Sequence, residues 1–126
     1  MKTSRQHNDT EVTELEGQQC QKLLAVPSAE EGVLTVLYLR AGGHWYRFYL
    51  DECVLFLDLC GEPDKEEDLE KGQAYVDVAR QLDVVDQSIE SMVMCECTLR
   101  LTFASGSPLV LRERQDGQTE WVRGTR

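Results

Sequence analysis

Cysteine is the first residue type to consider for chemistry in this 126-residue chain, which contains five of them. Cys95 and Cys97 form a Cys-x-Cys pair, the spacing closest to a metal ligand set. On a strand, two such residues share a face about 7 Å apart, so they could hold one metal ion only if the strand bent. A structural zinc site needs two close ligand pairs, and Cys53 and Cys60 do not form the second. We therefore expect Cys95 and Cys97, which fall on the apolar parity of their strand, to pack in the core.

Histidine-dependent chemistry is nearly excluded, because the chain has only His7 and His44. His44 falls at a predicted hairpin turn, where a structural role is a better interpretation than a Cys–His dyad. The sequence contains neither a Walker-type phosphate loop nor a nucleophile elbow. We expect no catalytic residue, no metal site and no cofactor.

Acidic residues are abundant, with 23 Asp and Glu against 13 Lys and Arg. Many lie between Gly61 and Gly72, but this run lacks the central glycine of an EF-hand loop, and Lys65 falls among the ligand positions. We interpret it as a solvated acidic loop. Its candidate partner-steering residues are Asp64, Glu66, Glu67 and Asp68.

The net charge of −10 restricts the classes of partner. Nucleic acid and anionic membranes are poor partners, because their phosphates would repel the chain. No apolar run approaches the roughly 20 residues that span a bilayer. Residues 1–10 are polar and do not resemble a signal peptide. We expect a cytoplasmic protein with reduced thiols.

A hairpin is predicted where Gly42-Gly43 separates Val33–Arg40 from Trp45–Leu50. This turn places Leu37 opposite Phe48 on a core face. On the outer face it places Arg40 opposite Trp45, Tyr38 opposite Arg47, and Val36 opposite Tyr49. Tryptophan, tyrosine and arginine anchor many interfaces. The candidate partner-binding residues on this face are Arg40, Trp45, Arg47 and Tyr49. The alternative is that another layer of the same chain covers the face.

A second meander is predicted near the C-terminus. Its strands are expected at Ile89–Cys95, Leu99–Phe103, Leu109–Arg114 and Thr119–Val122, with apolar residues at odd positions through Phe103. A turn centred on Asp116-Gly117 would place Leu111 opposite Val122 and Arg112 opposite Trp121.

The two meanders resemble each other. Sliding the chain by 64 residues places Leu37 on Leu101 and Gly42 on Gly106, and Gln18–Cys20 resembles Gln87–Ile89. This favours an internal duplication, although any two meanders share a period of two. By the same analogy we predict a strand rather than a helix at Cys20–Val26.

We therefore predict a mainly β fold, with α+β as the alternative. Two antiparallel meander units would pack as a sandwich or a partly open barrel, with one short helix across Ala79–Val85 in the connection. Residues 1–13 are predicted to form a disordered tail. A single domain would cover 14–126, with unit one at about 15–60, the acidic connection at 61–85 and unit two at 86–123.

The function expected from these features is non-catalytic protein binding. An acidic, compact domain would suit the neutralisation of a basic partner, as a bacterial immunity protein does for its toxin. This analogy rests on charge and size alone. The alternatives are a small-molecule binder or enzyme that uses a β-barrel pocket, and a self-associating structural domain that forms a homodimer.

Overall fold

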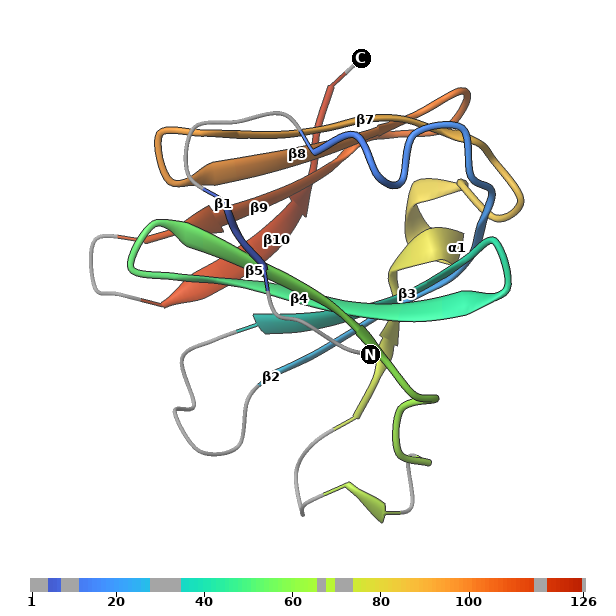
Figure 1. The fold of residues 1–126 in the computed structure, drawn as a ribbon, viewed down its shortest axis with the longest axis horizontal. Coiled ribbons are helices and arrows are strands. Elements are labelled where there is room, and N and C mark those ends of the chain that lie inside the picture. The colour runs from blue at the N-terminus through green and yellow to red at the C-terminus, as the bar shows by residue number, and fades with distance from the viewer. Residues whose placement is uncertain are drawn as a thin grey trace.

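The computed structural model describes residues 5–7, 12–27, 35–65, 68–69, 74–114 and 118–125. Two antiparallel sheets pack face to face as a sandwich and do not close into a barrel (Figure 1). The first sheet has the order β1-β5-β4-β3-β2-β6, with β1 (Arg5–His7), β2 (Cys20–Pro27), β3 (Thr35–Ala41), β4 (His44–Asp51), β5 (Val54–Cys60) and β6 (Val76–Asp77). The second has the order β10-β9-β8-β7, with β7 (Ile89–Cys95), β8 (Thr98–Phe103), β9 (Leu109–Glu113) and β10 (Thr119–Arg123).

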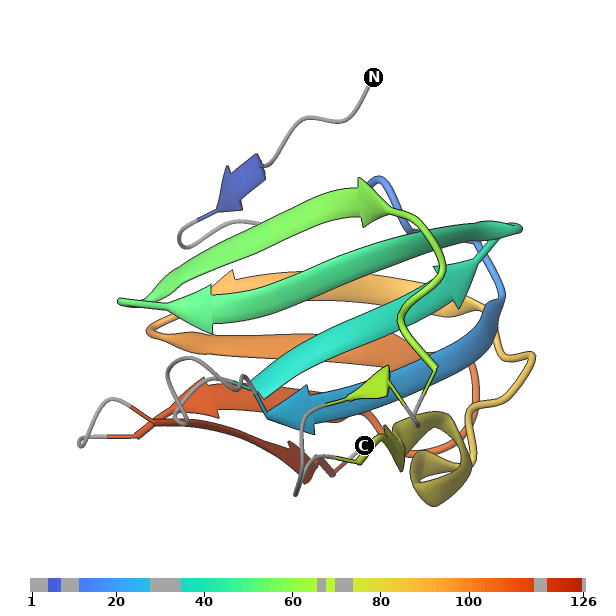
Figure 2. The ribbon, with the colours of Figure 1, turned by 90° about the horizontal axis from the view of Figure 1, so that it is seen from below.

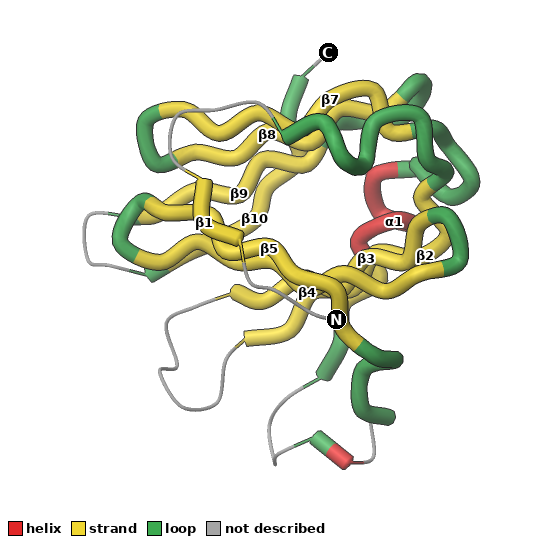
Figure 3. The backbone as a smooth tube through the Cα atoms, in the orientation of Figure 1, coloured by secondary structure: helices red, strands yellow, loops and turns green. Residues whose placement is uncertain are grey.

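Each sheet contains four consecutive strands that form a meander, β2 to β5 and β7 to β10. The predicted mainly β fold with two meander units is therefore confirmed. The short helix α1 (Val78–Leu82) lies beside the two layers and covers one side of the core (Figure 3). Its Asp77 N-cap accepts a hydrogen bond from the Arg80 amide, and Val78, Ala79 and Leu82 are buried.

The two meanders meet at the segments that resemble each other in sequence. The Cys20 amide donates to the Gln87 carbonyl, and the Ile89 amide donates to the Gln18 carbonyl, both at 2.8 Å. These two bonds flank the antiparallel bridge between Gln19 and Ser88, and every bridge of this type has the same local two-fold symmetry. The internal duplication therefore stays a prediction.

The core lies between the sheets and comes from alternate positions on each strand, as the period-two pattern predicts. Removing a large apolar side chain from water stabilises the fold by about 1.5–3 kcal/mol. The largest fully buried side chains on the strands include Leu23, Leu37, Leu39, Phe48, Leu50, Leu55, Met92, Met94 and Phe103.

The predicted parity of β7 is wrong. A β-bulge between Ile89 and Ser91 shifts the register against β8, so that Met92 and Met94 face the core. Val93 and Cys95 consequently face solvent. The expectation that Cys95 packs in the core is therefore overturned.

The predicted register of the last hairpin is wrong by one residue. Trp121 pairs with Leu111, and Glu120 pairs with Arg112. The Arg114 amide donates to the Gln118 carbonyl, which makes the connection three residues long rather than two. Because the loop has three residues rather than two, each residue of β9 lies opposite the β10 residue one position earlier than predicted.

The N-terminal segment also differs from the predicted tail. Arg5–His7 forms strand β1 beside β5, and Val12 is buried with its amide bonded to the Met92 carbonyl at 2.7 Å. In contrast, the strand predicted at Cys20–Val26 is confirmed as β2, and the predicted helix overlaps α1.

Candidate functional site

The outer surface of the first sheet carries the aromatic and arginine residues that were predicted to bind a partner. We call the residues Tyr38, Arg40, Trp45, Arg47, Tyr49 and Phe56 on β3, β4 and β5 the outer aromatic face. The predicted pairs Arg40 with Trp45 and Tyr38 with Arg47 are confirmed, as is Leu37 with Phe48 on the core side. Figure 2 views the molecule from the side of this face. The Gly-Gly turn therefore brings all four predicted partner-binding residues of the hairpin together.

A polar row crosses the middle of the outer aromatic face. Arg47 pairs with Tyr38 on one side and with Asp58 on the other. Its Nη2 lies 3.4 Å from Asp58 Oδ2, and the Asp58 side chain is only 7% exposed. Burial raises the pKa of Tyr38 above its ordinary value of 10.0, while its hydrogen bond and charge contact with Arg47 oppose that shift. The guanidinium is thus held in place from two sides.

Aromatic contacts hold other side chains of the face. The rings of Tyr49 and Phe56 stack with centroids 5.2 Å apart and planes 13° apart. Tyr38 meets Tyr75 edge to face at 6.2 Å. Such pairs contribute about 0.5–1.5 kcal/mol beyond burial. Phe56 and Asp58 were not predicted as site residues, although both lie on the outer side of β5, opposite Tyr49 and Arg47.

The acidic connection borders the outer aromatic face. The Tyr75 hydroxyl donates to the Asp64 carbonyl at 2.6 Å, which holds this segment near Tyr38. Figure 2 shows the connection crossing in front of the sheet after β5. Asp64 and Asp68 are exposed, whereas the predicted Glu66 and Glu67 lie outside the described residues. The alternative prediction was that another layer of the same chain covers this face. Tyr75 contacts Tyr38 in this way, whereas Trp45, Arg47 and Tyr49 are partly exposed.

The outer surface of the second sheet has a different composition. In the described part of β8, β9 and β10 it carries no aromatic side chain, because Trp121 packs against the core. Arg112 Nη2 lies 3.1 Å from Glu120 Oε2, an exposed ion pair. The residues on this surface are Arg100, Thr102, Val110, Arg112, Glu120 and Val122.

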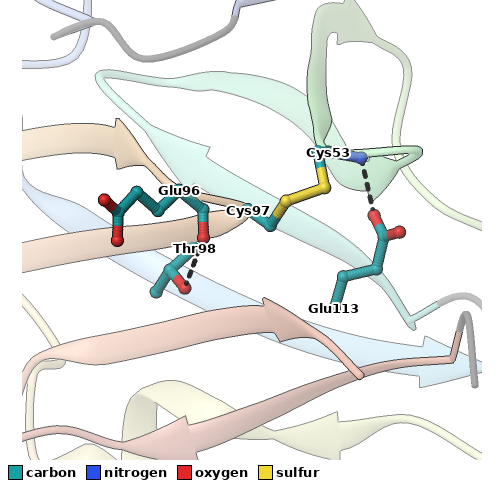
Figure 4. The surroundings of a disulfide bond; sticks show 5 residues. All are labelled: Cys53, Glu96, Cys97, Thr98 and Glu113. Atoms are coloured by element: carbon teal, nitrogen blue, oxygen red, sulfur yellow. Dashed lines mark hydrogen bonds between the residues drawn. A yellow bond between two sulfur atoms is a disulfide. The ribbon is translucent and has the colours of Figure 1, made fainter. Parts of the chain in front are cut away.

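A disulfide joins the two sheets at one end of the sandwich (Figure 4). It links Cys53, in the β4–β5 turn, to Cys97, in the β7–β8 turn. The prediction of reduced thiols, and of Cys97 as a core residue, is wrong for this pair. Pairing across 44 residues has no local signal in the sequence.

Both turns use the dipeptide Glu-Cys where hairpins favour Asn-Gly. Glu52 and Cys53 have φ of 50° and 62°, and Glu96 and Cys97 repeat these values. The left-handed region costs an L-residue about 1–2 kcal/mol. Glu113 holds both turns: its Oε1 accepts from the Cys53 amide at 2.8 Å, and its amide donates to the Cys97 carbonyl at 3.3 Å.

The three remaining cysteines occupy different environments. Cys20 is buried, and burial raises the pKa of its thiol to about 12. Cys60 is half-buried opposite Trp45, and Cys95 is exposed. The described residues contain no group of three or more His, Cys, Asp or Glu side chains able to hold a metal ion. Within the same part of the chain, no helix has the length and apolar character needed to cross a membrane.

Comparison with known proteins found no matching family model, no similar curated protein and no similar solved structure.

Proposed function

We propose that this chain is a non-catalytic protein-binding domain that contacts its partner through the outer aromatic face. The observation that carries the proposal is the contrast between the two outer surfaces. The second meander contributes to the same core, and its outer surface is polar and aliphatic. The fold itself therefore does not require Trp45, Tyr49 and Phe56 on the outer surface of the first meander. Interface hot spots are enriched in tryptophan, tyrosine and arginine, and this face presents all three partly exposed or exposed.

The geometry of the face also suits binding. Arg47 is oriented by Tyr38 and Asp58, and Tyr49 is stacked on Phe56. Side chains that are already ordered lose little conformational entropy when a partner covers them. The face therefore combines apolar area with a low entropic cost of association.

The charge distribution favours a basic partner. The chain carries a net charge of −10, and the exposed Asp64, whose carbonyl accepts from the Tyr75 hydroxyl, borders the outer aromatic face. A partner with a basic surface would be steered toward this side, and its association would slow as salt rises. Neutralisation of a basic toxin, in the manner of an immunity protein, is the specific role that we propose on this analogy of charge and size.

The two alternative functions receive unequal support. The sheets do not close into a barrel, and apolar side chains occupy the space between them, so nothing favours a ligand in a barrel interior. Self-association through the outer aromatic face uses the same surface as the proposed binding, and the experiment below separates the two.

The test places a photo-crosslinking amino acid at Trp45, with Val110 on the second sheet as the matched control position. Each variant is cross-linked in the native host, and the captured protein is identified, purified and titrated against the wild-type chain. We expect capture from position 45 only, and more than about 30-fold weaker binding for Trp45→Ala, which corresponds to a hot spot of 2 kcal/mol or more. Val110→Ala should bind within about twofold of wild type.

Equal capture from both positions, or unchanged affinity of Trp45→Ala, would contradict the proposal. Capture of a second copy of the chain would replace it with self-association. Substitution of Asp64, Glu66, Glu67 and Asp68 by their amides should reduce the association rate and its dependence on salt.

A further inference from the structure

Two positive charges lie directly opposite each other on the outer surface of the first sheet. Lys22 on β2 pairs with Arg40 on β3, and both side chains are exposed. Directly opposed side chains on neighbouring strands have Cβ atoms about 4.5–5.5 Å apart, and like charges at this separation destabilise a sheet. We call these two residues the cationic pair. The chain contains 23 acidic residues, yet the strand register places two cations together here.

Charged residues at equivalent cross-strand positions elsewhere are complementary. Arg47 lies opposite Asp58 in the first sheet, and Arg112 lies opposite Glu120 in the second. Both make ion pairs, with closest nitrogen–oxygen distances of 3.4 Å and 3.1 Å. The cationic pair, in contrast, makes no ion pair or side-chain hydrogen bond with the described residues. Its donors are therefore available to an acceptor from outside the chain.

The cationic pair is continuous with the outer aromatic face. Trp45 lies opposite Arg40 on the far side of β3 from Lys22, and its ring is partly exposed. Arg47 occupies the next outward position along β4, diagonally across from Arg40, where side chains are about 7–8 Å apart. Only Arg47 has a carboxylate beside it, from Asp58. The surface around Trp45 is thus locally positive, although the chain as a whole is strongly negative.

Acidic residues border this positive centre. Asp77 on β6 is exposed and lies opposite Leu24, the outward residue of β2 that follows Lys22. Asp64 is exposed as well, and its carbonyl accepts from the Tyr75 hydroxyl. A complementary partner surface has the reverse order, with a negative group at its centre and positive groups around it.

We propose that Lys22, Arg40 and Trp45 recognise one carboxylate of the protein partner, from an Asp or Glu side chain that precedes or follows an apolar residue. The inference rests on the proposed function, because it assigns the chemistry that the outer aromatic face contacts. The Arg40 guanidinium donates two parallel hydrogen bonds to the carboxylate, and the Lys22 ammonium donates a third. The apolar neighbour packs on the Trp45 ring. The bound carboxylate also relieves the repulsion within the cationic pair.

The charge of the whole chain favours a carboxylate over a phosphate. A phosphorylated side chain carries a charge of about −1.5 to −2 at pH 7, which a chain with a net charge of −10 repels more strongly than a single carboxylate. One carboxylate within an otherwise basic surface complements both the cationic pair and the acidic residues around it. This arrangement is compatible with the basic partner proposed above.

The test uses two capped tetrapeptides, acetyl-Phe-Asp-Gly-Lys-amide and the same peptide with Asn in place of Asp. Each is titrated into the isotope-labelled wild-type chain at neutral pH and followed by NMR. The Asp peptide is neutral and the Asn peptide is a monocation, so the net charge of −10 by itself favours the Asn peptide. We expect the reverse, with a dissociation constant about fivefold lower for the Asp peptide. The largest shifts should fall at Lys22, Arg40 and Trp45.

Matched variants assign the preference to the cationic pair. Lys22→Gln and Arg40→Gln should each reduce it to about twofold or less, since each removes one charged donor. The double variant should prefer the Asn peptide, because only the net charge of the chain then acts. Arg112→Gln is the control, because this exposed arginine has the same cross-strand setting on the second sheet, and it should keep the wild-type ratio.

Three results would overturn the proposal. They are equal or tighter binding of the Asn peptide by wild type, no shifts at the cationic pair up to about 20 mM peptide, and an unchanged ratio in the double variant. The peptide titration does not require the partner, so it fails separately from the proposed function. Capture of a partner from position 45 without a preference for the Asp peptide would remove only the carboxylate site. A preference without capture would contradict only the proposed function.

Discussion

The two meanders of this protein share a strand order but differ on their outer surfaces. Both place leucine and phenylalanine on the inner face, where the sheets share one core. Outside, the first carries stacked aromatic rings and a half-buried ion pair, whereas the second carries an exposed Arg112–Glu120 pair. The comparison separates what the fold requires, which is an apolar inner face, from what it leaves free for binding.

The turns differ in the same way. In the β3–β4 turn, Gly42 and Gly43 have φ of 60° and 81°, a conformation without steric clash for glycine because it has no Cβ. The β4–β5 and β7–β8 turns adopt positive φ with Glu-Cys instead. The glycine turn is determined locally, while the two Glu-Cys turns are joined to each other by the disulfide.

The largest expected effect tests whether the two inner faces are equivalent. Phe48 and Phe103 are both fully buried, one on each sheet. Phe48→Ala and Phe103→Ala should each lower the free energy of unfolding by about 3–5 kcal/mol, because each leaves a cavity in one shared core. Urea denaturation should show a single transition for both variants. Two separate transitions would mean that the meanders fold independently.

The next effect concerns the link between the meanders. Cys53→Ser/Cys97→Ser should lower the free energy of unfolding by about 2–4 kcal/mol, because the unfolded chain regains the freedom of the closed loop. A reducing agent should destabilise the wild type by a similar amount and leave the double variant unchanged. Urea denaturation with and without the reductant measures both, and a destabilised double variant that still responds to reductant would contradict the assignment.

A smaller effect compares the two outer surfaces directly. Tyr49→Ala removes a stacked ring and should lower the free energy of unfolding by about 0.5–1.5 kcal/mol plus lost burial. Arg112→Ala removes an exposed ion pair and should change it by no more than about 1 kcal/mol. Thermal denaturation of the two variants side by side gives the comparison. A larger loss for Arg112→Ala would reverse the assigned roles of the two surfaces.

The smallest effect is a pH dependence specific to the outer aromatic face. The pKa of Tyr38 is raised by burial above 10.0, so the folded state binds its proton more tightly than the unfolded state. The resulting stability is present below pH 10 and is lost as pH rises through the folded pKa. Tyr38→Phe should therefore reduce the fall in stability above pH 10, measured by urea denaturation at pH 9 and pH 11. An unchanged slope would show that Tyr38 is not the group responsible.

Local patterns predicted much of the candidate site. The Gly-Gly turn sets the pairing of Arg40 with Trp45 and of Tyr38 with Arg47, and both were expected and found. Phe56 and Asp58 were not predicted, because β5 is a nearly continuous apolar run and its sequence does not show which positions face outward. Pairing with β4 places Phe56 opposite Tyr49 and Asp58 opposite Arg47. Cys95 was misplaced because a β-bulge leaves no reliable mark in an alternating sequence.

The sequence by itself determined the β-rich class, the two meanders and the first hairpin, because turn chemistry and period-two alternation act between neighbouring residues. Only the tertiary structure decided the partners of Cys53 and Cys97, the register of β10 against β9, and which outer surface stays partly exposed. Those features depend on how segments far apart in the chain pack against one another, and local preferences do not encode that arrangement.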